Sequence, residues 1–177
     1  MLLLSMILIV SSGCGKKNQP NTIIDNKSLH DVVTAIDDAF AAEYGEGVQA
    51  VYMATPINKR YLEDFCNISP EIIEEFAGFV SYSITNSDSL IAVKSKEGFA
   101  SVVKAAFEKR LKDLLAQYEK FPVNHSYERA LRGKIYVKGD YLFLIVVGIE
   151  TDGADLSQAF ANDVQRAVNT IDKLFYE

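Results

Sequence analysis

Apolar residues recur at helical spacing in three stretches, Ser28–Gly45, Glu97–Lys120 and Asp155–Phe175, and each predicts an amphipathic helix. Ser28 and Asp155 suit the N-cap position at the start of the first and third stretches. We expect the apolar stripes to face a core: Leu29, Val32, Val33, Ile36 and Phe40; Phe99, Val103, Phe107, Leu111, Leu114, Leu115 and Tyr118; and Leu156, Phe160, Val164, Val168, Ile171 and Phe175.

Alternating and continuous apolar runs predict four strands in two hairpins. Phe79–Ile84 alternates, and Leu90–Val93 returns after a polar turn. Lys134–Val137 also alternates, Gly139-Asp140 suits a two-residue turn, and Tyr141–Val147 is apolar throughout, as in a strand covered on both faces. We therefore expect an α+β fold in which amphipathic helices pack a four-stranded, mostly antiparallel sheet.

Three glutamates follow the dipeptide Ser69-Pro70, in which Ser suits a helix cap and Pro the first helical position. Glu71, Glu74 and Glu75 would then lie in the opening turns of a helix, where the dipole stabilises carboxylates. The alternatives are a calcium site and an acid/base pair of Glu71 and Glu75. We expect dipole complementation and solubility to explain the cluster.

The other connecting segments predict only short elements. Val48–Ala54 is either a strand or a connector, because its period favours neither. Lys59–Phe65 predicts a short helix. Pro122 ends the long helix before it, and Tyr127–Leu131 suits one more helical turn.

Composition indicates a folded, acidic domain. The chain has 177 residues, of which 49% are hydrophobic, and this argues against disorder. Lys and Arg number 18 against 24 Asp and Glu, giving a net charge of −6. Nucleic-acid binding is disfavoured, because it requires a basic patch. We expect residues 28–177 to form one globular domain.

The N-terminal residues are typical of an export signal. Met1–Val10 is apolar, too short to span a bilayer but long enough for the core of a signal peptide. The following Ser-Ser-Gly-Cys, which ends at Cys14, resembles the lipobox of bacterial lipoproteins, although Ser11 stands where an aliphatic residue is expected and no Lys or Arg precedes the run. An uncleaved signal-anchor is the alternative.

That resemblance implies a signal peptide over residues 1–13 and a lipid on Cys14. Residues 14–27 are polar and without a period, so we expect a flexible tether. Two or more acyl chains anchor a protein durably to a membrane. The expected location is therefore the extracytoplasmic face of the cell membrane, with the membrane itself as a partner through the lipid.

Three blocks carry a second resemblance: Phe65–Phe76, Leu90–Lys94 and Lys134–Val146. With their spacing they cover most of residues 53–148, and they resemble the lipoprotein domain-of-unknown-function family 4358 of Gram-positive bacteria. The resemblance implies a lipoprotein anchor and a fold shared with that family. Because the family has no established activity, it implies no catalytic or binding residue.

No catalytic motif stands out in the sequence. We find no Gly-x-Ser-x-Gly, no His-Glu-x-x-His and no glycine-rich phosphate loop. Cys66 with His125 is the one nucleophile pair that the composition allows, and Cys66 better suits a small buried apolar residue. His30 better suits a solvated side chain than a metal ligand. We expect no enzymatic activity, no metal and no cofactor.

The expected function is a binding or interaction module at the cell envelope, with an unknown envelope protein or small ligand as partner. Its candidate contact surfaces are the acidic cluster Glu71, Glu74 and Glu75 and the loop from Phe121 to Tyr127. The alternatives are an extracytoplasmic hydrolase using carboxylates or Cys and His, and a ligand-free structural subunit of an envelope complex.

Overall fold

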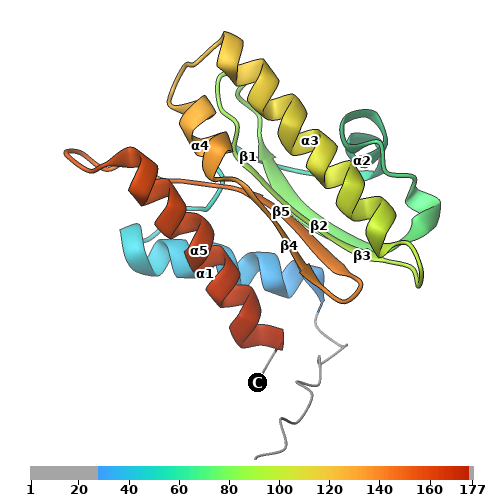
Figure 1. Cartoon of the computed structure of the whole chain (residues 1–177). Coiled ribbons are helices and arrows are strands. Elements are labelled where there is room, and N and C mark those ends of the chain that lie inside the picture. The colour runs from blue at the N-terminus through green and yellow to red at the C-terminus, as the bar shows by residue number, and fades with distance from the viewer. Residues whose placement is uncertain (1–27, 176–177) are drawn as a thin grey trace, which may run out of the picture.

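The computed structural model of the protein describes residues 28–175. The predicted signal peptide, the lipid on Cys14 and the tether fall on residues 1–27 and lie outside the described residues. Within residues 28–175, five α-helices pack on a five-stranded antiparallel sheet, as expected of an α+β fold (Figure 1).

The sheet is the middle one of three layers. Its strand order is β1-β2-β3-β5-β4, and every neighbouring pair is antiparallel. Helices α1 and α5 cover one face, and α2 and α3 cover the other, with α4 beside α3 (Figure 1). The helices are α1 (Leu29–Tyr44), α2 (Lys59–Cys66), α3 (Ala100–Lys120), α4 (Ser126–Arg132) and α5 (Leu156–Phe175). The strands are β1 (Ala54–Pro56), β2 (Ile73–Ser81), β3 (Ser89–Ser95), β4 (Lys134–Lys138) and β5 (Tyr141–Val146).

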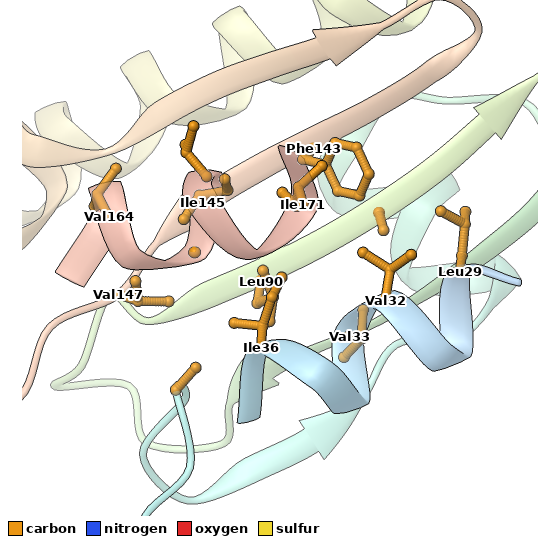
Figure 2. Packing of buried hydrophobic residues seen from close by; sticks show 14 of the residues in the cluster. Leu29, Val32, Val33, Ile36, Leu90, Phe143, Ile145, Val147, Val164 and Ile171 are labelled. Carbon is orange, nitrogen blue, oxygen red and sulfur yellow. The ribbon is translucent and has the colours of Figure 1, made fainter. Parts of the chain in front are cut away.

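The central strands β3 and β5 are buried on both faces and supply two cores. Leu90 of β3 and Phe143 of β5 pack with α1 and α5 (Figure 2), whereas Ile91 and Leu144 pack with α3. Successive residues of a strand point to opposite faces, so a continuously apolar strand feeds both cores at once. The prediction that the run beginning at Tyr141 forms a central strand is confirmed.

The predicted helix starts are also confirmed. Ser28 Oγ accepts a hydrogen bond from the backbone N–H of His30 at 3.2 Å, and Asp155 Oδ1 accepts one from Gln158 at 3.2 Å. These caps satisfy backbone donors that the first turn of each helix leaves free. Of the stripe predicted for α3, Phe99 differs, because it precedes the helix and is exposed.

The sheet has five strands where the sequence predicts four. The additional strand is β1, whose three residues pair with β2 from Ala54 opposite Ser81 to Pro56 opposite Phe79. Three residues are too few to show a period, and Pro56 is tolerated because β1 is an edge strand. The undecided segment Val48–Ala54 therefore contributes only its last residue to the sheet.

The helix predicted from Pro70 is wrong. The chain makes one 3-10 turn at Pro70–Ile72 and then enters β2, which begins at Ile73. Consequently the strand predicted over Phe79–Ile84 starts earlier and ends at Ser81. The spacing of Ile72, Ile73 and Phe76 imitates a helix, but pairing with β3 supplies ladder hydrogen bonds along nearly all of β2.

Gly78 lets β2 lie close against β3. Its φ is +139°, and a Cβ there would lie 2.1 Å from the carbonyl oxygen of Leu90. The carbonyl of Gly78 accepts a hydrogen bond from Ile57 at 3.0 Å, which holds the chain where it leaves β1. A side chain at this position would push apart the two strands on which both cores rest.

We predict that Gly78→Ala lowers the free energy of unfolding by about 3 kcal/mol or more, because strain at positive φ adds to the clash with Leu90. The matched variant Gly98→Ala has a φ of +83° with nothing within 4 Å, so only about 1 kcal/mol of backbone strain applies. Urea unfolding of the purified chain measures both. Equal losses in the two variants would contradict the steric explanation.

Candidate functional site

Four connections meet at one end of the sheet, which we call the loop end: residues 45–53, 82–88, 121–125 and 147–155. Backbone and side-chain bonds join them there, for example Tyr82 N–H to the carbonyl of Met53 at 3.1 Å. Ser28 lies at the opposite end, where its hydroxyl donates to Glu75 near the start of β2 at 3.1 Å. The first described residue and the loop end are therefore separated by the length of the sheet (Figure 1).

Arg129 of α4 ties two of these connections together, residues 121–125 and 147–155, through three hydrogen bonds. Its Nε donates to the carbonyl of Gly148 at 3.0 Å, Nη1 to that of Asn124 at 3.2 Å, and Nη2 to Glu150 Oε1 at 3.1 Å. The guanidinium is only 3% exposed and lies over the ring of Phe160, 4.8 Å from its centroid. A guanidinium is suited to this role, because its planar fork can satisfy several acceptors at once.

Asp88 is the buried counter-charge of Arg129. The residue is 2% exposed, and its Oδ1 lies 3.0 Å from Arg129 Nε. That N–H points to Gly148, so Oδ1 has charge attraction but no hydrogen bond from a described residue. The other oxygen, Oδ2, accepts from the backbone N–H of Tyr52 at 2.9 Å. Burial raises the pKa of Asp88 to about 6 and outweighs the lowering effect of Arg129.

An open pocket of about 380 Å³ lies over this ion pair. Its wall brings together all four connections of the loop end: Tyr52, Asn86, Asp88, Asn124, Arg129, Gly148, Ile149 and Glu150. Arg129 and Asp88 lie beneath, whereas Glu150, Asn124 and Tyr52 are exposed at the rim. With both acids ionised, two carboxylates outnumber one guanidinium, so the site carries a net charge of about −1.

This arrangement suits binding of a cation or a hydrogen-bond donor. The Glu150 carboxylate at the rim is a direct acceptor, and the exposed ring of Tyr52 offers a π-face to a cationic group. Among residues 28–175 there is no group of three His, Cys, Asp or Glu side chains that could hold a metal ion. No helix in this part of the chain is long and apolar enough to cross a membrane.

The acidic cluster lies at the other end of the sheet from this pocket. Glu71 is exposed on the 3-10 turn, and Glu74 forms an ion pair with Lys94 at 3.1 Å. Glu75 Oε1 accepts from the backbone N–H of Leu29 at 2.7 Å and from Ser28. A carboxylate does stabilise a helix N-terminus here, but the carboxylate is that of Glu75 and the helix is α1.

The other predicted contact surface, the loop from Phe121 to Tyr127, lies at the loop end, apart from the acidic cluster. Phe121 follows α3 and is exposed, whereas Tyr127 is half-buried and packs on the α3 core. The two predicted contact surfaces therefore do not meet.

Cys66 and His125 are not brought together either. Cys66 ends α2, while His125 is an exposed residue preceding α4 beyond the C-terminus of α3. In Figure 1, α2 and α4 lie beside different parts of α3. Burial raises the pKa of the Cys66 thiol to about 11, so it carries no thiolate at neutral pH. The interpretation of Cys66 as a buried apolar residue is confirmed.

Sequence reasoning missed Asp88 and Arg129. Asp88 stands in a polar segment that resembles an ordinary turn, and Arg129 stands in a short helix without a strong period. The available signal was an acid two positions before the apolar run Leu90–Val93, together with an Arg between the core-facing Tyr127 and Ala130. Neither signal predicts the pair, because 41 positions separate the two residues in the sequence.

We predict that Asp88 makes the protein less stable at pH 7 than at pH 4. Its pKa of about 6 exceeds the ordinary value of 3.8, so between these values the folded chain binds a proton that the unfolded chain does not. The free energy of unfolding therefore rises as the pH falls through this window, by up to about 3 kcal/mol from this group.

Urea unfolding from pH 4 to pH 7 measures this dependence in the wild type, in Asp88→Asn and in Asp152→Asn. Asp88→Asn is expected to lack the rise, and Asp152→Asn, which removes an exposed acid of a neighbouring loop, is expected to keep it. An unchanged pH dependence in Asp88→Asn would show that the protonation of Asp88 does not cause the rise in stability.

Comparison with known proteins identifies the family but no characterised relative. Residues 49–147 match a family described as a domain of unknown function, DUF4358, as the resemblance in the sequence implies. The match spans more than half of the 177 residues, and it includes β1 to β5 with the helices between them. No curated protein and no solved structure matches the chain. The chain therefore belongs to the DUF4358 family.

Proposed function

We propose that this protein is a membrane-anchored, extracytoplasmic binding module that takes a small ligand carrying an ammonium group. The observation that carries the proposal is the negatively charged pocket at the loop end, with the Glu150 carboxylate and the Tyr52 ring at its rim. An ammonium group would gain a charge-assisted hydrogen bond from the first and a cation–π contact from the second.

The architecture supports a binding role in two further ways. Arg129 fixes the connections that carry the pocket, so a ligand would meet a largely preformed site at little ordering cost. In addition, Ser28 lies at the opposite end of the sheet, so a tether from Cys14 would join the domain at the end away from the pocket and leave the pocket accessible.

The alternatives receive less support. For a hydrolase, the acid/base pair of Glu71 and Glu75 lacks a shared site, because Glu75 is engaged with the first turn of α1 and Glu71 lies on an exposed turn. A ligand-free structural subunit would have no need of a charged pocket. These alternatives become the stronger ones if the ligand test below fails.

The ligand prediction is tested by thermal unfolding of the full chain in a non-ionic detergent and phosphate buffer, since Tris is itself an amine. The panel pairs glucosamine with N-acetylglucosamine, and alanyl-alanine with its N-acetyl form. An amine at a hundred times its Kd adds ~2.7 kcal/mol, which raises Tm by roughly 5 °C or more. The acetylated partners, which lack the charge, are expected to have no effect.

Two variants link the response to the pocket. Glu150→Gln removes the rim carboxylate and is expected to abolish the shift, whereas Asp152→Asn removes an exposed acid from the same connection and is expected to preserve it. Equal shifts with amines and acetylated compounds, no shift at all, or identical behaviour of the two variants would each contradict the proposed ligand class.

The anchor is tested separately. Cells expressing the protein are grown with labelled palmitate, and the membrane fraction is separated. Cys14→Ala is expected to lose the label, while Cys66→Ala, which changes the only other cysteine, is expected to keep it because Cys66 is buried. A label that persists in Cys14→Ala would overturn the lipoprotein assignment without affecting the pocket.

A further inference from the structure

A second hollow, which we call the Arg110 groove, shares the lining residues Asn86 and Asp88 with the pocket. It has a volume of about 290 Å³ and lies between α2, the end of β2 and α3. Its wall includes Tyr61 and Phe65 of α2, Tyr82 and Ile84 beyond β2, and Arg110, Leu114 and Tyr118 of α3.

The groove exposes apolar side chains that a monomer normally buries. Tyr82 is 70% exposed and Ile84 is 86% exposed, and Phe65 across the groove is also exposed. The side chain of Ile84 is presented by a short connection whose backbone is fixed, because Tyr118 Oη donates to the carbonyl of Ile84 at 3.2 Å and to that of Asn86 at 2.8 Å. Exposed apolar groups gathered around one hollow are typical of a contact surface.

Arg110 adds a specific charge to this surface. Its guanidinium lies 5.9 Å from the centroid of the Phe65 ring, and Nη2 donates to Tyr61 Oη at 3.2 Å. Within residues 28–175 no carboxylate pairs with it, and its Nε is buried without a hydrogen-bond partner. The acids two and three positions away on the helix, Glu108 and Asp113, are already paired with Lys104 and Lys109.

The other arginines of the described residues have partners or lie in solvent. Arg60, Arg129 and Arg166 each form an ion pair with at least one carboxylate, and the exposed Arg132 donates to Ser157. A partly buried guanidinium without a counter-ion costs desolvation energy that an incoming anion recovers. The planar, two-pronged donor geometry of Arg fits one carboxylate.

We propose that the Arg110 groove binds a peptide segment of another protein in which a carboxylate side chain adjoins an apolar residue. The apolar residue packs against Phe65, Tyr82 and Ile84, and the carboxylate pairs with the guanidinium of Arg110. Complementarity is thus both hydrophobic and ionic, which fixes the direction of the peptide as well as its position.

The test selects a displayed library of random heptapeptides on the full chain, immobilised in non-ionic detergent. Selected peptides are expected to carry Asp or Glu within two positions of an aromatic or large aliphatic residue. The dissociation constants of synthetic versions are then measured by fluorescence polarisation. Arg110→Gln and Ile84→Ser are each expected to weaken binding about tenfold or more. Replacing the peptide acid by its amide is expected to weaken it to the same degree.

Lys109→Gln is the matched control, because it removes a positive charge from the position before Arg110, outside the groove. This variant is expected to bind the peptide as the wild type does. Thermal unfolding checks that every variant is folded, and exposed Ile84 makes Ile84→Ser the safer of the two groove variants. Any of three results would overturn the proposal. The selected peptides are not enriched in Asp or Glu, Lys109→Gln and Arg110→Gln weaken binding equally, or the wild type enriches no more peptides than a chain carrying both groove substitutions. If the chain self-associates and Ile84→Ser abolishes this association, the groove binds a second copy of the chain, and the peptide proposal is wrong.

Discussion

The burial of β3 and β5 on both faces is the constraint on which the rest of the structure depends. Their alternating residues feed two cores at once, so the sheet is stable only when α1 and α5 cover one face and α2 and α3 the other. The close approach of β2 at Gly78 and the edge strand β1 are consequences of the same pairing, because β3 needs a neighbour on its outer side. Most of the apolar residues of the chain serve this purpose.

A sheet covered on both faces leaves its ends as the place for polar groups. At the loop end the connections cannot bury backbone groups without partners, and Arg129 supplies several of the donors they need. Asp88 then compensates the buried charge at the expense of its own hydration, which is why its pKa is raised. The same pair stabilises the connections and lines the pocket, whose excess negative charge comes from the carboxylate of Glu150.

The pocket and the Arg110 groove share the wall formed by Asn86–Asp88, yet they differ in chemistry. One carries excess negative charge and suits a cation, whereas the other exposes apolar side chains around an unpaired guanidinium and suits an acidic peptide. Because Tyr118 holds the carbonyls of Ile84 and Asn86, the wall has one fixed position relative to α3. The two proposed sites, one for a small amine and one for an acidic peptide, therefore adjoin one segment whose backbone Tyr118 holds.

The sequence by itself determined the elements whose residues interact locally: the caps at Ser28 and Asp155, the stripes of α1, α3 and α5, and the turn between β4 and β5. These depend on neighbours a few positions apart, so their period is visible in the chain. Only the tertiary structure decided that the residues after Pro70 form a strand, because pairing with β3 outweighs the local preference. The same holds for the ion pair of Asp88 with Arg129 and for the isolation of Arg110, since a contact between distant residues leaves no periodic trace in the sequence.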